Sequence, residues 1–405
     1  MTQAPMSPAL IALLLSMMLG IQPITTDLYL PALPALTESF AAPMTHAQLT
    51  LSALLLAFGI SQLVWGPLSD RFGRRPILLW GLSAYTLASI ASTFTPTMSQ
   101  LISWRVVQGA AMGAVVMCAR AIVRDLYKPT DGARVMSRAL TGLGIIAGIC
   151  APLGGVLAGV LGWRTALASM AVFSAASLLL IALRFQESLT LKNPHALNPA
   201  TMARTWLMIL RNPVFLTWSA LSIASYGAMF TFLAGSSFVF IKVLGLSTTQ
   251  YGLLLFVASM FYILGTMLCR RLLVRFGIRQ AIAIAGVMSI TAGTSMGLLA
   301  WAGVSNVWAV VIPHFLFMIG HGIHQPCSQS GVAGPFPQAA GAASAMNGFM
   351  MMAMAFVMGG WMGRHMDGTV LPMTNGMWFW TVLLAGMAWT VVQKYGEPAH
   401  ETAKP

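Results

Sequence analysis

The chain has 405 residues, of which 57% are hydrophobic and only 8% are charged. Soluble domains carry roughly a quarter charged residues, so this composition excludes a soluble globular protein. Apolar stretches of about 20 residues, the length that crosses a bilayer, recur from Pro8 to Lys394. The sequence therefore predicts a polytopic, all-α membrane protein.

Twelve membrane helices are expected along the chain. Their ranges are 9–36, 47–68, 76–95, 98–123, 136–161, 164–184, 213–241, 250–269, 280–302, 307–328, 341–362 and 376–394. The longest polar interruption, residues 185–212, lies at the centre of the chain. This pattern predicts an N-terminal six-helix bundle over 1–184, a cytoplasmic linker over 185–212, and a C-terminal six-helix bundle over 213–405.

The net charge of +13 would suggest nucleic-acid binding in a soluble protein, but its distribution indicates a membrane topology. Seventeen of the 22 Lys and Arg fall in alternate loops or in the C-terminal tail: Arg71, Arg74, Arg75, Arg124, Lys128, Arg134, Arg138, Arg184, Lys192, Arg204, Arg211, Arg270, Arg271, Arg275, Arg279, Lys394 and Lys404. The opposite loops hold only Arg164, Lys242 and Arg364. The positive-inside rule then predicts an even number of helices, with both termini cytoplasmic and no nucleic-acid partner.

The first expected helix carries the only acid that this topology leaves inside the membrane, Asp27. The other acids lie in loops or in the tail: Glu38, Asp70, Asp125, Asp131, Glu187, Asp367, Glu397 and Glu401. A carboxylate inside a membrane is costly and by default functional. Alternation between a desolvated environment and one beside an Arg would let Asp27 bind and release a proton. The alternative is a packing role, with Asp27 bonded to the backbone or to Thr25 or Thr26.

The turn between the second and third expected helices has a distinctive sequence, Gly-Pro-Leu-Ser-Asp-Arg-Phe-Gly-Arg-Arg over residues 66–75. It resembles the signature loop of the major facilitator superfamily (MFS), Gly-x-x-x-Asp-Arg-x-Gly-Arg-Arg. Every fixed position matches: Gly66, Asp70, Arg71, Gly73, Arg74 and Arg75. The resemblance implies two pseudosymmetric six-helix bundles that carry out secondary transport. It also implies that this loop is a gate, with Asp70 set against a helix N-terminus in the other bundle.

Part of this loop returns in the second half of the chain. The residues from Arg71 to Arg75 correspond to those from Arg275 to Arg279, an offset of 275 − 71 = 204 residues. Val274 replaces the acid in the second copy. An internal duplication of this kind is typical of transporters built from repeated bundles.

Two arginines lie in the helix expected at 98–123. Asp27 is 36 − 27 = 9 residues, about 13 Å, from the periplasmic end of its helix, and Arg105 is 105 − 98 = 7 residues, about 10 Å, from the same side. This matching depth predicts an ion pair between Asp27 and Arg105. Arg120 lies about 22 Å deeper but only about 60° away around the helix, so it is expected to face the substrate cavity. Snorkelling of Arg120 to the cytoplasmic headgroups is the alternative.

Further motifs narrow the resemblance. Arg105-Val106-Val107-Gln108-Gly109 is similar to the superfamily's Arg-x-x-Gln-Gly motif. Pro152, Gly154 and Gly155 resemble the Gly-Pro-x-x-Gly-Gly motif of drug/proton antiporters, with Ala151 in place of the first Gly and one spacer residue missing. The segments 26–34, 119–125 and 162–164 look like the Bcr/CflA branch, which exports bicyclomycin, chloramphenicol-type drugs and some metabolites.

The second half offers histidines in place of acids. His314, His321 and His324 share one face of the helix expected at 307–328. No buried carboxylate or nearby Cys pair accompanies them, and Cys327 is the only candidate for a further ligand, so no metal site is expected. Packing as neutral side chains, proton relay and substrate contact remain open. We expect His321 to line the substrate cavity with Tyr29, Tyr226 and Phe230, although aromatic residues at helical spacing also occur in cores and on lipid-facing surfaces.

These observations favour a proton-coupled transporter that exports small amphiphilic compounds from a bacterial cell. We expect it to act as a monomer in the inner membrane, with protons as its coupling ion and no cofactor. An exporter or importer of a metabolite with the same fold is the main alternative. An intramembrane enzyme or a receptor fits less well, because no convergent catalytic set is evident. No nucleotide-binding loop is evident either, so we do not expect ATP-driven transport by this chain alone.

Overall fold

The computed structural model describes residues 7–127, 129–194 and 196–396. All regular secondary structure in these ranges is helical. The described part contains 11 helical segments that are long and apolar enough to cross a membrane. Some predicted loop and tail positions lie outside the described residues, and so do two side chains near the start of α6: Lys128, Glu397, Glu401 and Lys404, and the side chains of Asp131 and Arg134. The prediction of an all-α membrane protein is confirmed.

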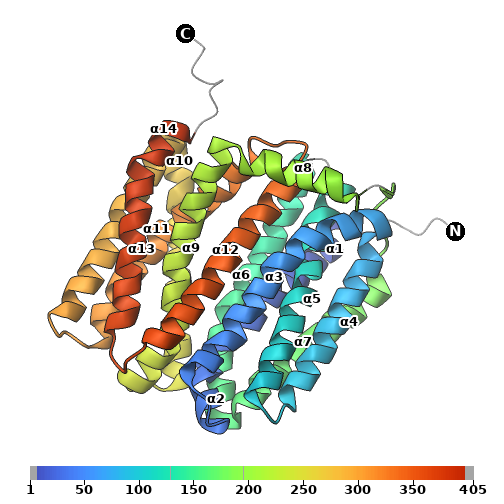
Figure 1. Ribbon diagram of the computed structural model, residues 1–405. Coiled ribbons are helices and arrows are strands. Elements are labelled where there is room, and N and C mark those ends of the chain that lie inside the picture. The colour runs from blue at the N-terminus through green and yellow to red at the C-terminus, as the bar shows by residue number, and fades with distance from the viewer. Residues whose placement is uncertain (1–6, 128, 195, 397–405) are drawn as a thin grey trace. The chain divides into compact units, whose positions relative to one another are not determined.

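The chain divides into two compact units. The first contains the described residues up to Pro199 together with Ser247–Leu253. Its elements are α1 (Pro8–Thr26), η1 (Leu30–Ala32), α2 (Leu33–Ser39), α3 (Met44–Phe72), α4 (Arg74–Thr93), α5 (Met98–Leu126), α6 (Pro129–Val156), η2 (Leu157–Leu161) and α7 (Trp163–Arg184). Helix α5 packs against both α3 and α4, whereas α1 packs on α6 and α4 on α7 (Figure 1).

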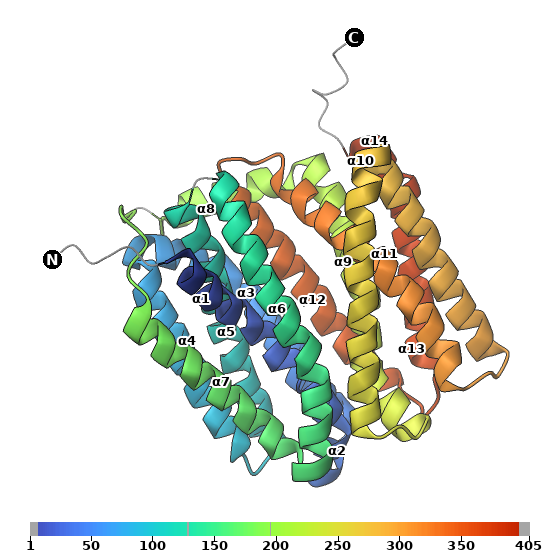
Figure 2. The same ribbon diagram turned by 180° about the vertical axis from the view of Figure 1, so that it is seen from behind.

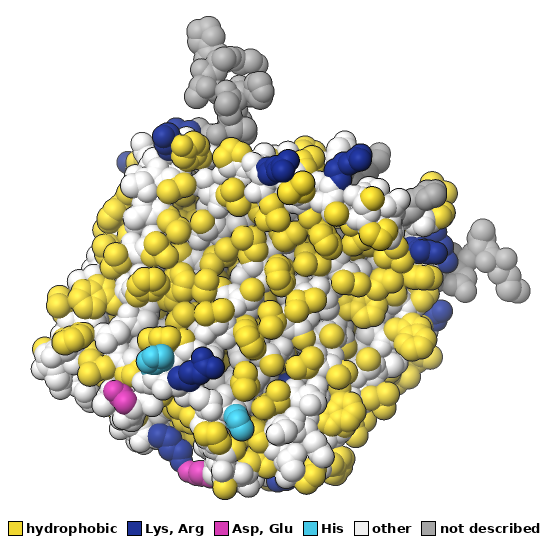
Figure 3. Space-filling model, in the orientation of Figure 1, with side chains coloured by type: hydrophobic (Ala, Val, Ile, Leu, Met, Phe, Trp, Pro, Cys, Tyr) yellow, Lys and Arg dark blue, Asp and Glu magenta, His cyan; other side chains and the backbone are white. Residues whose placement is uncertain are grey.

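The second unit contains the described residues of 200–246 and 254–396. Its elements are α8 (Pro199–Leu210), α9 (Pro213–Phe238), η3 (Val239–Val243), α10 (Thr248–Trp301), α11 (Val307–Ala333), α12 (Ala340–His365), α13 (Leu371–Trp389) and α14 (Val391–Tyr395). Helix α9 packs against α11, α12 and α13. Hydrophobic side chains cover the faces of α9, α12 and α13 that Figure 3 shows, as expected for helices in lipid.

Helix α10 is 54 residues long, about 81 Å, which is far more than one bilayer crossing needs. Gly277 interrupts it with φ 75° and ψ 175°, a conformation that only glycine adopts readily. Figure 2 shows α10 as two separate legs that meet at one end. Counting each leg, the 11 spans become twelve crossings, which agrees with the twelve predicted helices.

The first membrane helix differs from its prediction. We expected one helix over 9–36, but α1 ends at Thr26 and helical structure resumes only at Leu30. Proline has no N–H, so Pro31 cannot donate to the Asp27 carbonyl and Pro34 cannot donate to the Leu30 carbonyl. The bond missing at the Asp27 carbonyl lies in the gap between α1 and η1, whereas the Leu30 carbonyl accepts from the Leu33 N–H instead.

The central linker also differs from a plain polar connection. It contains helix α8, which the sequence analysis missed. Its exposed apolar residues include Leu207, Met208 and Leu210. They lie in sequence between two exposed arginines, Arg204 in the helix and Arg211 directly after its end. Such a mixed surface helix has neither the length nor the uniform hydrophobicity of a membrane span, and a search for apolar stretches therefore passes over it.

Candidate functional site

Asp27 lies at the break in the first membrane helix. It is the C-cap of α1, and its backbone N–H donates to the Pro23 carbonyl at 2.8 Å. Its side chain is half-buried and accepts a hydrogen bond from the Thr26 hydroxyl at 2.8 Å. Residues 28–30, which follow it, are buried, so the carboxylate sits at the edge of an apolar interior.

Arg105, on α5, is fully buried in the first unit. Its Nη2 donates to the Thr25 carbonyl at 2.8 Å, and its Nη1 donates to Gln108 Oε1 at 2.9 Å. Its Nε donates to the Thr50 carbonyl at 3.3 Å. The guanidinium also lies over the Tyr29 ring, 4.2 Å from its centroid. Arg105 therefore joins α1, α3 and α5 mostly through backbone carbonyls.

The predicted ion pair between Asp27 and Arg105 is wrong for this structure, because neither ion pair found among the described residues includes them. The helix break gives the physical reason. In an unbroken helix the Thr25 carbonyl would accept from the Tyr29 N–H, but that N–H donates to Thr26. The Thr25 carbonyl is thus left for Arg105, while the Asp27 side chain bonds to Thr26.

The polar interior around Arg105 includes residues that the sequence analysis did not single out as functional. Gln108 Nε2 donates to the Ser89 hydroxyl at 2.8 Å, and the Thr25 hydroxyl bonds to the Tyr85 hydroxyl. The signal for Gln108 was present in the Arg-x-x-Gln-Gly motif. Ser89 and Tyr85 carry no local signal, because the partner of Ser89 is on α5 and that of Tyr85 is on α1.

Of the two predicted cavity residues in the first unit, one is buried and the other is exposed. Tyr29 is fully buried, and its hydroxyl donates to Thr50 Oγ1 at 2.8 Å. Arg120, on α5, is exposed, and neither ion pair of the described residues includes it. The structure therefore places Tyr29 in the interior of its unit and Arg120 on its surface.

The predicted cavity residues of the second unit lie near one another on α9 and α11. Tyr226 stacks on Phe230 with ring centroids 6.4 Å apart, and His321 Nδ1 hydrogen-bonds to the Ser225 hydroxyl at 2.8 Å. Phe230 is buried, whereas Tyr226 is half-buried. The ring centroids of His321 and Tyr262 are 5.6 Å apart.

The other two histidines of α11 make separate contacts. His314 stacks on the Phe232 ring with centroids 3.4 Å apart, and His324 Nε2 bonds to the Ser289 hydroxyl at 3.2 Å. Among the described residues no cluster of three metal-binding side chains is found.

The signature loop forms a polar network inside the first unit. Arg74 is buried and pairs with Asp70 at 2.7 Å and with Asp125 on α5 at 2.8 Å. Glu187, which follows α7, accepts hydrogen bonds from the backbone N–H of Arg74 at 2.9 Å and of Arg75 at 3.1 Å. Glu187 therefore caps the N-terminus of α4, a role that the sequence analysis did not predict.

The remaining loop positions support this network to different degrees. Gly73 has φ 110°, and an added Cβ would lie 2.5 Å from a Glu187 carboxylate oxygen, so the turn requires glycine. Arg75 donates to the Ala182 carbonyl at 3.0 Å, and Arg71 is exposed above the Phe72 ring. At Gly66 an added Cβ would meet only Met117, at 3.7 Å, so this glycine is not sterically required.

The antiporter-like motif of Pro152, Gly154 and Gly155 lies beside the break between α1 and η1. Pro152, Gly154 and Gly155 are in α6, and Gly154 allows the α6 backbone to approach the Leu28 carbonyl so closely that no Cβ would fit. Gly155 is buried against the first turn of α10, Ser247–Leu253, which groups with the same unit. The motif thus supports the segment that carries Asp27.

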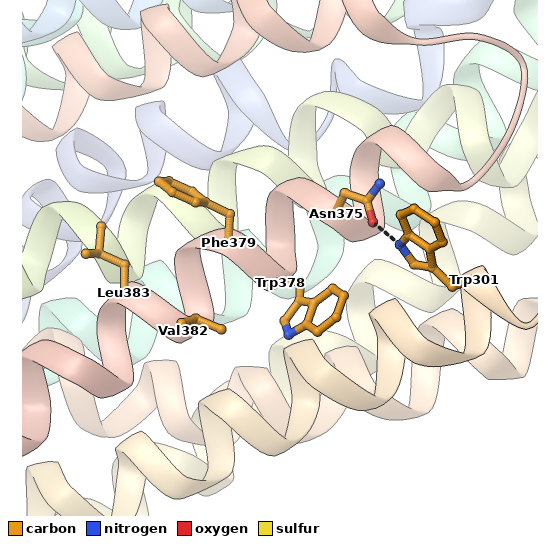
Figure 4. A pocket seen from close by; sticks show the side chains of 6 residues that line it. All are labelled: Trp301, Asn375, Trp378, Phe379, Val382 and Leu383. Carbon is orange, nitrogen blue, oxygen red and sulfur yellow. Dashed lines mark hydrogen bonds between the residues drawn. The ribbon is translucent and has the colours of Figure 1, made fainter.

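A cavity of about 470 Å³ lies between α13 and the end of α10. Figure 4 shows its lining, in which the Trp301 Nε1 donates to the Asn375 Oδ1 at 2.9 Å. Its other lining residues are apolar: Trp378, Phe379, Val382 and Leu383. None of the predicted cavity residues is among them. Exposed tryptophans at the end of a span are typical of the membrane interface.

Comparisons with known proteins point to one family. The sequence profile of the Major Facilitator Superfamily matches residues 10–360. Multidrug resistance protein D of Escherichia coli (strain K12) is 28% identical over 337 residues, which are 83% of this chain and 84% of that protein. The bicyclomycin resistance protein homolog of Haemophilus influenzae is 26% identical over 355 residues, 87% of this chain and 88% of that protein. These names agree with the predicted Bcr/CflA resemblance.

Solved structures share the fold. A bacterial homolog of the human lysosomal transporter Spinster has a TM-score of 0.73 at 14% identity, covering 96% of this chain and 97% of that one. A D-xylose-proton symporter has a TM-score of 0.68 at 16% identity, covering 95% of this chain and 98% of that one. At such identities the likeness concerns the fold alone, and it confirms the predicted fold class.

Proposed function

The chain belongs to the Major Facilitator Superfamily, and from this premise we propose that it exports small amphiphilic drugs in exchange for protons. Its relatives named for resistance to multiple drugs, to bicyclomycin and to chloramphenicol support this class of substrate. The chloramphenicol resistance protein of Pseudomonas aeruginosa is 36% identical, over 34% of this chain. Transport, and not catalysis, is the activity that the family indicates.

The position of Asp27 carries the proton-coupling part of the proposal. Its span runs from Pro8 to Ser39, so Asp27 lies 27 − 8 = 19 residues from one end and 39 − 27 = 12 from the other. The other acids within described spans lie close to span ends: Glu38, Asp70 and Asp125. Asp27 has Thr26 as its hydrogen-bond partner and no cation, so its charge is poorly compensated in an apolar environment. Protonation of the Asp27 carboxylate removes the cost of burying its charge, and exposure to water lets the carboxylate release the proton.

We propose that the helix break is the segment that moves during coupling. The Asp27 N–H still makes the regular helical bond to the Pro23 carbonyl, but the Leu28 N–H donates to the same carbonyl and the Tyr29 N–H donates to Thr26. Pro31 has no N–H to offer the Asp27 carbonyl. Arg105 holds the end of α1 through the Thr25 carbonyl. We propose that Arg105 anchors the segment, while Asp27 exchanges the proton.

The proposed substrate-binding residues differ in how far their side chains are exposed. A side chain that contacts substrate must be reachable, which favours Arg120 and Tyr226. Tyr29 and Phe230 are buried and would act by supporting their neighbours. His321, held by Ser225, would offer a polar contact beside the stacked pair of Tyr226 and Phe230.

We place the transporter in the inner membrane of a bacterium as a monomer, with both termini cytoplasmic. The concentration of Lys and Arg in alternate loops supports this topology. We assign no nucleic-acid partner and no metal or organic cofactor. The signature loop, with its network around Arg74, would act as the cytoplasmic gate, and its contact with the other bundle stays a prediction.

The test is drug-induced proton movement in vesicles that contain the purified protein. We expect Asp27→Asn to abolish it, because an amide does not titrate, and Asp27→Glu to retain part of it. Asp367→Asn is the matched control. Hydrogen bonds from Thr369 lower the pKa of Asp367, so this loop acid stays ionised at neutral pH. Full proton movement in Asp27→Asn at normal folding would refute the assignment.

A further inference from the structure

One face of helix α8 combines charge with exposed apolar surface. Arg204, Leu207, Met208 and Arg211 follow the spacing i, i+3, i+4 and i+7, which places them on the same side of the helix. All four are exposed, with Leu207 at 49% and Met208 at 50%. The opposite side is anchored to the protein by Ile209, which is fully buried. The two apolar side chains thus lie between two guanidinium groups.

This face borders a groove of about 640 Å³ within the second unit. The groove is lined by Arg204, Leu207 and Met208 of α8, by Arg211 and Asn212 after its end, by Pro213 at the start of α9, and by Pro335 and Phe336 after α11. Phe336 packs edge-on against the buried Phe215, with centroids 6.2 Å apart, and so gives the groove an apolar wall. The volume is in the range of about 300–1,000 Å³ that small-molecule sites occupy.

The groove lies at the start of a candidate membrane span, where lipid headgroups are expected. The membrane span of α9 begins at Pro213, one residue after Asn212, whose Oδ1 caps α9 by accepting from the N–H of Val214 and Phe215. Figure 1 shows α8 lying across the end of α9. In Figure 3 dark-blue side chains mark the upper edge where α8 lies, above a surface that is mostly hydrophobic. A helix in this position lies in the interface, with apolar side chains toward the acyl chains.

The positive charge of the groove has no acidic partner among the described residues of its unit. Between residues 200 and 396 the only acid is Asp367, which lies in the α12–α13 connection. Neither ion pair among the described residues includes Arg204 or Arg211. Two exposed arginines that make no ion pair in the described part of the chain, beside an apolar wall, complement a molecule that has an anionic phosphate and hydrocarbon chains.

We propose that the α8 groove binds one anionic phospholipid of the adjacent leaflet. Its phosphate lies between Arg204 and Arg211, and an acyl chain packs along Leu207, Met208 and Phe336. Arginine is suited to this role because its planar guanidinium forms paired hydrogen bonds to phosphate oxygens. The site is separate from Asp27 and from the proposed substrate-binding residues, and it does not depend on the direction of transport.

The experiment measures lipid binding to the purified full chain in a neutral detergent by native mass spectrometry. Phosphatidylglycerol is compared with phosphatidylethanolamine of the same acyl chains. We expect Arg204→Gln with Arg211→Gln to weaken phosphatidylglycerol binding about 30-fold, since each arginine near a membrane surface contributes about fivefold. Arg271→Gln with Arg275→Gln removes the same charge from an exposed face of α10 and should leave this binding unchanged.

Two further arms keep the result decisive. The double variant Leu207→Ser with Met208→Ser retains both charges. It should weaken the binding of the diacyl lipid and leave the weak binding of glycerol phosphate unchanged. Arg204→Lys with Arg211→Lys should keep most of the preference for phosphatidylglycerol, which guards against misfolding of the glutamine variant. Equal loss in the α8 and α10 glutamine variants would overturn the proposal. Binding of inorganic phosphate as tightly as phosphatidylglycerol would overturn it as well.

Discussion

The two copies of the signature loop share a backbone but not a charge network. In the first, Gly73 has φ 110° and Arg71 lies over Phe72, 5.5 Å from the ring centroid. In the second, Gly277 has φ 75° and Arg275 lies over Phe276 at 5.0 Å. The first copy adds Asp70, Arg74 and Asp125, whereas the second has Ile278 and an exposed Val274. Glycine thus suffices for the turn, and among the described residues only the first copy has an acid and a charge network around it.

The same contrast separates the interiors of the two units. The first buries Arg105 among backbone carbonyls and has Asp27 at a broken helix. Among its described residues the second has Asp367 as its only acid, and it buries the neutral or weakly basic side chains of His314, His321 and His324. The division of labour implied is that the first unit handles charge, while the second provides an adaptable polar and aromatic surface.

The largest expected effect comes from removing the buried arginine. Arg105→Ala leaves the Thr25 carbonyl and Gln108 Oε1 without a donor, which should lower the free energy of unfolding by about 2–5 kcal/mol. His324→Ala in the second unit removes a contact with Ser289 and should cost about 1–2 kcal/mol. Titration with a denaturing detergent in mixed micelles measures both. Arg105→Lys should recover only part, because an ammonium cannot reach all three acceptors. If Arg105→Ala and His324→Ala lowered the free energy of unfolding equally, the proposed difference between the charged interior of the first unit and the neutral interior of the second would be contradicted.

The next effect concerns the charge network of the first loop. Arg74→Ala leaves Asp125 nearly buried and unpaired, so we expect a loss of about 2–4 kcal/mol. Arg71→Ala changes the same charge at an exposed position and should cost less than about 1 kcal/mol. The same unfolding measurement applies, and the loss in Arg74→Ala should shrink when Asp125→Asn is added. A loss that Asp125→Asn does not change would show that the pair contributes little.

The sequence was most informative where a local pattern determines the structure. The ten residues 66–75 predicted the turn between α3 and α4, and Gly73 proved to need its special conformation. Repeated apolar stretches predicted the spans, including the two legs of α10 around Gly277. Both depend on neighbours within a few residues, which a single sequence displays.

The pairing of Asp27 with Arg105 was wrong because the depth argument assumed a straight helix. In the structure the Tyr29 N–H donates to the Thr26 carbonyl, which leaves the Thr25 carbonyl to Arg105, 80 residues away in sequence. The cap that Glu187 provides spans 113 residues to Arg74 and was missed for the same reason. Contacts of this kind depend on how helices pack, which residue spacing along one helix does not determine.

The smallest expected effect compares the two glycines directly. Both have a conformation that is essentially restricted to glycine, so alanine at either position should cost about 1–3 kcal/mol from the backbone alone. At Gly277 an added Cβ meets nothing within 4 Å, whereas at Gly73 it would push the Glu187 carboxylate away from the α4 N-terminus. Losing that cap should add about 1 kcal/mol, so Gly73→Ala should be the more destabilising change.

A double-mutant cycle isolates this extra cost. In a Glu187→Ala background the cap is already absent, so Gly73→Ala should fall to the cost of Gly277→Ala. Gly277→Ala itself should be unaffected by Glu187→Ala, because no neighbour of Gly277 would be displaced. If Gly73→Ala remained more costly without Glu187, the difference between the two loops would lie in the turn itself. The conclusion that glycine shapes both turns alike, with the network added only to the first, would then fail.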